Sequence, residues 1–184
     1  APTEAAVTTK PTKKQKVHLL TDVASAKAFF TKATSAVAVV LEHQAESLFG
    51  GGLAAVSLCS AEAGVARLEW QQTDAQKIFL DWVSDATAHK IFFDAKKQLH
   101  TLVPAGAVVA GEIDDVQVLA YLAEVTYDKT LDALAEVLRV PGATAAEKLL
   151  GCYTVLLEKL TTIAKEQSKE ENLLKVYTEL EKPL

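Results

Sequence analysis

The sequence predicts an α/β domain with a mixed central sheet flanked by helices and a helical C-terminal part. Strand-like segments come first, one or two strand–helix units follow, and the chain then reads as helix almost to its end. The segment "AVAVVLEH" is apolar on both faces, as a strand covered by helices on both sides should be. The chain has 184 residues, 49% apolar and 23% charged, which suits one folded domain with a sizeable core.

The residue pattern places each element in order. Residues 1–16 are rich in Thr, Lys, Pro and Ala without a hydrophobic period, so a linker or flexible arm precedes a domain at 17–184. Thr21 or Asp22 is a suitable N-cap for the first helix, and Asp94 for a later one. Strands are expected at 16–20, 36–43, 53–60, 64–70, 90–93 and 107–113, the second to fourth as a meander. Helices are expected at 21–33, 74–85, 94–102, 114–125, 130–138 and about 143–181, the last with a break near Lys169.

Composition argues against several classes of function. The net charge of −5 disfavours a large basic face for nucleic acid. No apolar run approaches the roughly 20 residues of a membrane span, and the N-terminus lacks the apolar core of a secretory signal. Cys59 and Cys152 have no partner at metal-ligand spacing, so we expect buried free thiols in a reducing cytoplasm.

Local motifs add no obvious chemistry. Gly50, Gly51 and Gly52 lack the spacing of a phosphate-binding loop and predict a hairpin turn. The four histidines, at 18, 43, 89 and 100, never fall four residues apart on one helix, so we interpret them as surface or packing residues. The acids Glu112, Asp114 and Asp115 lie at a strand-to-helix junction, where the helix dipole accounts for them.

Three segments carry a family resemblance. "HKIFFDAKKQLHTL", "DDVQVLAYLAEVTYDKTLDALAEVL" and the closing "LLKVYTELEKPL" occur in the order found in the 3′→5′ exonuclease domain of family A, polymerase I-type, bacterial DNA polymerases. The chain resembles that domain from about residue 17 to its C-terminus. The resemblance implies a ribonuclease H-like fold, with the strand at 36–43 as its key strand.

The resemblance also locates the positions of the family's metal-binding acids. In active members, four carboxylates hold two metal ions that activate water and stabilise the leaving 3′ oxygen. The acid-x-acid pair aligns with Leu41 and His43, and the Asn-x-x-x-Asp helix with Asp94 and Gln98. The Tyr-x-x-x-Asp segment aligns with Glu147 and Gly151, or alternatively with Tyr153 and Leu157. The resemblance therefore implies a vestigial site at Leu41, His43, Gln98 and Gly151, none of which is an acid.

A different register does not restore the pair. Leu41 and His43 share one face of the strand while Glu42 points to the other. Moving the alignment by one residue selects Glu42 and Gln44, which is still one carboxylate. We expect Glu42 and Glu46 to be solvated or salt-bridged.

The resemblance then implies a catalytically inactive domain that supports the polymerase architecturally in DNA replication and repair. It would hold no cofactor or metal, with magnesium belonging to a polymerase domain that follows Leu184. Its partners would be that domain, a preceding 5′-nuclease domain and, through the polymerase, DNA; it would be a cytoplasmic monomer with no membrane contact.

Two other functions stay open. One is a residual metal-dependent 3′→5′ exonuclease with displaced ligands at Glu42, His43, Glu46 and Asp94. The other is a scaffold that recruits a repair protein through an exposed apolar patch. Candidates for that patch are Phe92, Phe93, Trp70 and Trp82, although a place in the core or in the contact with the polymerase domain is the preferred explanation for them.

Overall fold

A six-stranded mixed sheet forms the centre of the molecule, in the order β1-β4-β3-β2-β5-β6. The structure, a computed structural model, describes residues 16–43, 52–71 and 73–166. Strands β2, β3 and β4 form the predicted antiparallel meander, whereas β5 and β6 continue the sheet parallel to β2, and β1 pairs parallel with β4. The strands are β1 His18–Leu19, β2 Val37–His43, β3 Leu53–Ser60, β4 Gly64–Glu69, β5 His89–Phe92 and β6 Glu112–Asp115.

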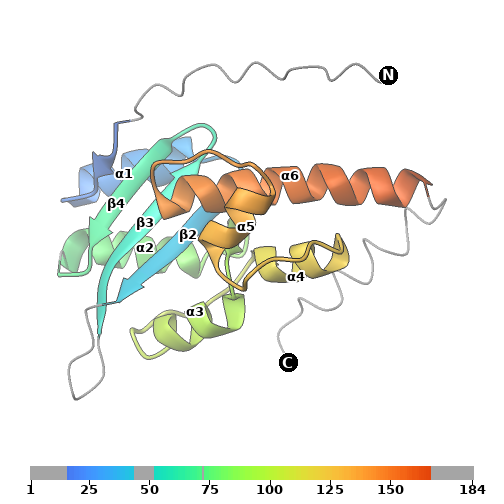
Figure 1. The fold of residues 1–184 in the computed structure, drawn as a ribbon. Coiled ribbons are helices and arrows are strands. Elements are labelled where there is room, and N and C mark those ends of the chain that lie inside the picture. Colours follow the sequence, from blue (N-terminus) through green and yellow to red (C-terminus); the bar gives the residue numbers. More distant parts are fainter. Residues whose placement is uncertain (1–15, 44–51, 72, 167–184) are drawn as a thin grey trace.

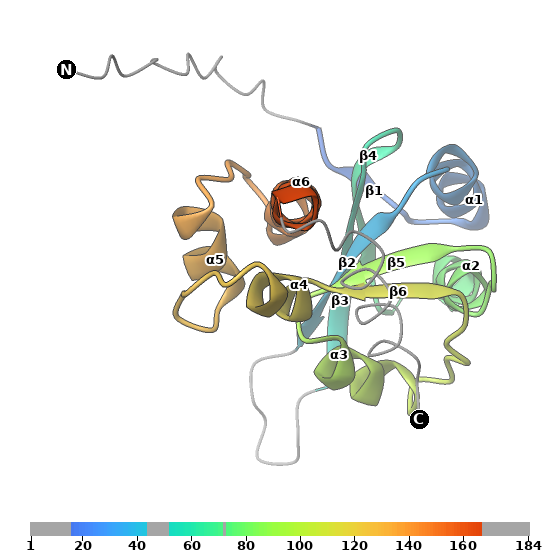
Figure 2. The same ribbon diagram turned by 90° about the vertical axis from the view of Figure 1, so that its right-hand side faces the viewer.

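Helices cover both faces of the sheet (Figure 1). Figure 2 shows α1 and α2 on one face and α4, α5 and α6 on the other. The helices are α1 Val23–Lys32, α2 Thr73–Val83, α3 Ala95–Leu102, α4 Val116–Leu122, α5 Leu131–Val137 and α6 Ala145–Glu166. The predicted fold class is therefore confirmed.

The core consists of two apolar clusters, one on each face. The first joins β2, β3 and β4 to α1 and α2, with Phe29 and Phe79 among its buried members. The second joins the opposite face to α4, α5 and α6, with Leu149 and Leu156 at its centre. Strand β2 contributes alternate residues to the two clusters, which is why its sequence is apolar on both faces.

Side-chain caps fix the helix starts that the sequence predicted. Asp22 accepts a hydrogen bond of 2.7 Å from the backbone N–H of Ser25, and the Ser25 hydroxyl accepts one from Asp22 N–H, forming a capping box. Asp94 caps α3 by accepting from Lys97 N–H. Both caps agree with the sequence-based assignment.

Two predicted boundaries were wrong. The last strand was expected at 107–113, but β6 is Glu112–Asp115. The helix expected from Asp114 begins at Val116, because Asp114 and Asp115 pair with Ile91 and Phe92 of β5. This pairing is non-local, so the local pattern could not reveal it.

Several predictions fall outside the described residues. These are the arm at 1–15, Gln44, Glu46, the turn at Gly50 and Gly51, and the helix beyond Glu166 with its break near Lys169. Within the described part, Cys59 and Cys152 are buried free thiols as predicted, and burial raises the pKa of each to about 11.

None of the helices in the described ranges combines the length and apolar character that crossing a membrane requires. The candidate aromatic residues contribute to the core, as the preferred explanation expected. Phe92 is fully buried, and the partly buried Trp70 and Trp82 pack against the first core cluster and Phe93 against the second.

Candidate functional site

Strand β2 ends at Leu41 and His43, the two positions that the sequence resemblance aligns with the acid-x-acid pair of active exonucleases. Leu41 is 5% exposed and packs in the first core cluster. Its backbone N–H donates a 3.2 Å hydrogen bond to Oε1 of Gln98 on α3. The structure therefore brings Leu41 and Gln98 together, as an apolar side chain beside a neutral amide. His43 lies exposed at the end of the strand, after an irregularity in the β2–β3 register.

Glu42 points to the opposite face of the sheet and is neutralised by protein groups. Arg67 Nη1 donates to both of its carboxylate oxygens at 2.6 Å, and Ser57 Oγ donates at 2.5 Å. Burial alone would raise the pKa of Glu42, but hydrogen bonds from Arg67 and Ser57 and the charge of Arg67 outweigh it, so the pKa is lowered. Arg67 also binds Glu69 at 2.7 Å. The expectation of a salt-bridged Glu42 is confirmed.

Gly151 lies on α6, close to the segment that leads into the helix. A Cβ atom built on Gly151 would overlap with Cγ1 of Val140. Glu147, one turn earlier, accepts hydrogen bonds from the N–H groups of Ala143 and Thr144. Leu41 packs on the α1–α2 face of the sheet, whereas α6 covers the other face, so the structure does not bring Gly151 to Leu41.

Replacing Gly151 with alanine is expected to destabilise the domain by about 1–2 kcal/mol, although alanine normally favours helices over glycine. The cause is the Val140 methyl group, which occupies the space of the new side chain. Urea unfolding of Gly151→Ala, Val140→Ala and the double variant measures this. The double variant should lose much less free energy of unfolding than the sum of the two single variants, because Val140→Ala removes the clash with the new methyl group at position 151. If the two losses simply add, the contact with Val140 is not what makes glycine necessary at position 151.

The alternative alignment of the Tyr-x-x-x-Asp segment selects Tyr153 and Leu157, and both side chains pack against other residues. The Tyr153 ring contacts the His89 ring edge-on with centroids 6.0 Å apart. Leu157 packs against the second core cluster. Neither position offers an acid.

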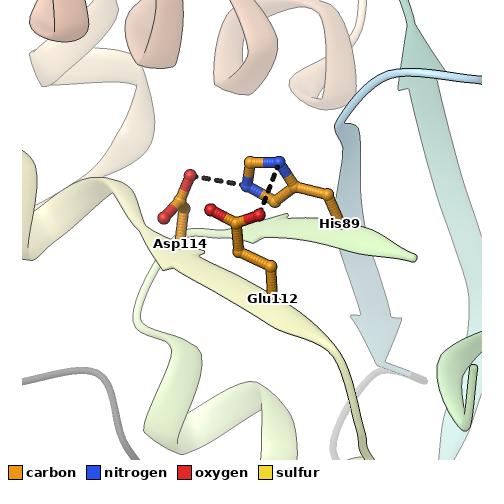
Figure 3. A group of neighbouring side chains, drawn as sticks. All are labelled: His89, Glu112 and Asp114. Atoms are coloured by element: carbon orange, nitrogen blue, oxygen red, sulfur yellow. Dashed lines mark hydrogen bonds and ion pairs between the residues drawn. The ribbon is translucent and has the colours of Figure 1, made fainter. Parts of the chain in front are cut away.

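A cluster that the sequence interpretation missed lies on β5 and β6 (Figure 3). His89 Nε2 is 2.7 Å from Oδ2 of Asp114, and His89 Nδ1 is 3.7 Å from Oε2 of Glu112. His89 does pack, against the ring of Tyr153, as the sequence interpretation allowed. The helix-dipole explanation of Glu112 and Asp114 was wrong, because both acids lie in β6 and face His89. Acids at alternate positions of a strand share a face, but this signal was lost when Asp114 was placed in a helix.

Asp115, in contrast, lies at the start of a helix as expected, and it is the N-cap of α4. Its carboxylate accepts hydrogen bonds from Gln117 N–H at 2.9 Å in α4, and from Asp94 N–H at 3.1 Å and Ala95 N–H at 2.8 Å at the start of α3. Burial raises the pKa of Asp115 despite these donors, which oppose the shift. One side chain thus ties the ends of two helices to β6.

No family model and no curated protein matches the sequence. Solved structures do match. The EXO domain of Aedes aegypti Nibbler aligns with a TM-score of 0.62 at 12% identity, over 80% of this chain and 89% of that one. Escherichia coli RNase D, an exoribonuclease involved in structured RNA processing, aligns with a TM-score of 0.59 at 15% identity, over 92% of this chain and 52% of that one.

A DNA polymerase also matches. The POL domain of Pol1 from M. smegmatis, in complex with DNA primer-template and dNTP, aligns with a TM-score of 0.64 at 17% identity. The alignment covers 88% of this chain but 29% of that one. Because identities this low show the fold alone, the chain is placed in one structural class, the ribonuclease H-like exonuclease fold.

Proposed function

We propose that the chain is a catalytically inactive exonuclease-like domain of a bacterial DNA polymerase I, with an architectural role in DNA replication and repair. The observation that carries the proposal is the end of β2. Leu41 is buried there, its N–H is bound by Gln98, and Glu42 is bound by Arg67. A two-metal site needs several converging carboxylates, and this arrangement offers apolar and internally neutralised groups instead.

The polymerase context rests on two supports. The sequence resembles the polymerase I exonuclease domain in three ordered segments, and the fold aligns with a polymerase of which this chain spans 29%. The parent enzyme would bind DNA and magnesium in a polymerase domain and work in the cytoplasm. This domain would contact the polymerase and 5′-nuclease domains within one monomer.

The residual exonuclease is the weaker candidate. Two of its four proposed ligands already have structural partners: Glu42 binds Arg67, and Asp94 caps α3. His43 is exposed at the strand end, and Glu46 lies outside the described residues. A nuclease would need Glu42 and Asp94 to leave these contacts and converge on a metal ion.

A nuclease assay tests the proposal. The purified chain is incubated with 3′-labelled single-stranded DNA in Mg²⁺ and then Mn²⁺, beside the Glu42→Gln and Asp94→Asn variants and an active 3′→5′ exonuclease. We expect no digestion above a buffer blank, whereas the active enzyme degrades the substrate fully.

Two outcomes would contradict the inactive assignment. Digestion that disappears in either variant would mean that Glu42 or Asp94 binds a catalytic metal. Digestion that co-purifies with the chain and persists in both variants would mean that acids elsewhere in the chain form the site.

A further inference from the structure

We propose that His89 and Glu112 bind a divalent cation of the zinc class, with the buried Asp114 orienting the imidazole. The three residues come from paired strands: His89 opens β5 and lies opposite Glu112 in the register, and Asp114 follows two residues along β6. Side chains at these positions project from the same face of the sheet, as Figure 3 shows. One atom of each lies within 4.8 Å of the others.

Asp114 sets the orientation of the ring. Its side chain is 5% exposed, and its Oδ2 atom lies 2.7 Å from His89 Nε2. An ionised carboxylate can only accept here, so Nε2 carries the hydrogen and the lone pair of the neutral ring is on Nδ1. Metal-binding histidines commonly donate their second N–H to a carboxylate in this way. The Tyr153 ring packs against the same imidazole at nearly a right angle and restricts its rotation.

The distance between His89 Nδ1 and Glu112 Oε2 is close to the distance between two atoms that bind the same metal ion. His89 Nδ1 and Glu112 Oε2 are 3.7 Å apart, which is too long for a hydrogen bond. Two ligand atoms at about 2.0–2.1 Å from a tetrahedral zinc ion lie roughly 3.4 Å apart. A small rotation of the Glu112 side chain would therefore bring its oxygen and His89 Nδ1 to the distance that both need to bind one ion. The Glu112 side chain is 69% exposed, which lets an ion enter from solvent and leaves room for water as further ligands.

This site is separate from the exonuclease positions. Lys90, the residue after His89, pairs with Val37 at the start of β2, while Leu41 lies four residues further along that strand. At about 3.3 Å per residue, the two places are on the order of 13 Å or more apart, at opposite ends of parallel strands. The inference therefore does not rest on the proposed function, and the nuclease assay can fail or succeed independently of it.

Zinc titration of the untagged chain tests the proposal. Isothermal calorimetry and the thermal unfolding midpoint are measured with Zn²⁺, with Mg²⁺ as a harder ion for comparison. We expect one Zn²⁺ per chain, a rise of the midpoint with zinc concentration, and no comparable rise with Mg²⁺. His89→Gln and Glu112→Gln should abolish stoichiometric binding, and Asp114→Asn should weaken it roughly 10–100-fold by releasing the ring.

Matched controls separate this site from unspecific binding. His18→Gln removes an exposed histidine from β1, and Glu136→Gln removes an exposed acid from α5; neither should change the affinity. Glu112 is an exposed side chain, so its variant should fold normally. The proposal is overturned if zinc does not bind one-to-one, or if binding is unchanged in Glu112→Gln. In that case His89, Glu112 and Asp114 form a polar cluster that links β5 to β6 without a metal ion.

Discussion

Asp115→Ala should lower the free energy of unfolding by about 2–4 kcal/mol, the largest effect expected of a single polar residue here. Three backbone N–H groups, those of Asp94, Ala95 and Gln117, donate to this carboxylate. Alanine leaves them without a charged acceptor at the first turns of α3 and α4, where helices have no internal partner for their N–H groups. Relief of the buried charge offsets part of the loss, because burial raises the pKa of Asp115.

Urea unfolding followed by circular dichroism measures this loss. Asp128→Ala, an exposed acid in the connection between α4 and α5, serves as control and should change stability by less than about 0.5 kcal/mol. Asp115→Asn should lose less stability than Asp115→Ala and more than Asp128→Ala, because the amide oxygen still accepts hydrogen bonds but carries no charge. An Asp115→Ala variant as stable as Asp128→Ala would mean that the three N–H groups find other acceptors at no cost.

Lys90→Met should cost about 2–3 kcal/mol at neutral pH. The Lys90 side chain is fully buried, and its Nζ donates to three backbone oxygens: Asp85 at 2.8 Å, Ala88 at 3.1 Å and Ala110 at 2.5 Å. The ammonium also lies 5.4 Å from the centre of the Trp82 ring. Methionine fills the space but binds none of these carbonyls, so the α2–β5 connection and the α3–β6 connection lose their common donor.

The pH dependence of this cost has a defined sign. Burial lowers the pKa of Lys90 from 10.5 to about 8. Between these values the unfolded chain binds more protons than the folded one, so wild-type stability rises with pH relative to Lys90→Met. From pH 7 to pH 9 the difference in free energy of unfolding between the wild type and Lys90→Met should increase by about 1 kcal/mol. If this difference decreases over the same pH range, the carbonyl oxygens hold the pKa of Lys90 above its ordinary value.

The elements that the sequence predicted well have local causes. Helix α1 begins at Asp22 because the cap and its partner Ser25 are three residues apart. Strand β2 could be recognised because contact with both core clusters makes every position from Val37 to Leu41 apolar. Each signal lies within a few residues of the feature that it predicts.

The features that were missed depend on distant partners. Arg67 meets Glu42 from 25 residues away, so the sequence could suggest a salt bridge but not its partner. His89 and Asp114 are also 25 residues apart, and only the β5–β6 pairing brings them together. The shift of the last strand from 107–113 to 112–115 has the same origin, because strand pairing decided it.

The contact between Gly151 and Val140 has a consequence for how the two positions can vary. A Cβ atom at position 151 would meet the Val140 methyl group, so a larger residue on α6 requires a smaller one at position 140. Substitutions at the two positions are therefore coupled, and neither can be interpreted by itself. Among homologues of this chain, a side chain at position 151 should occur together with a residue smaller than valine at position 140.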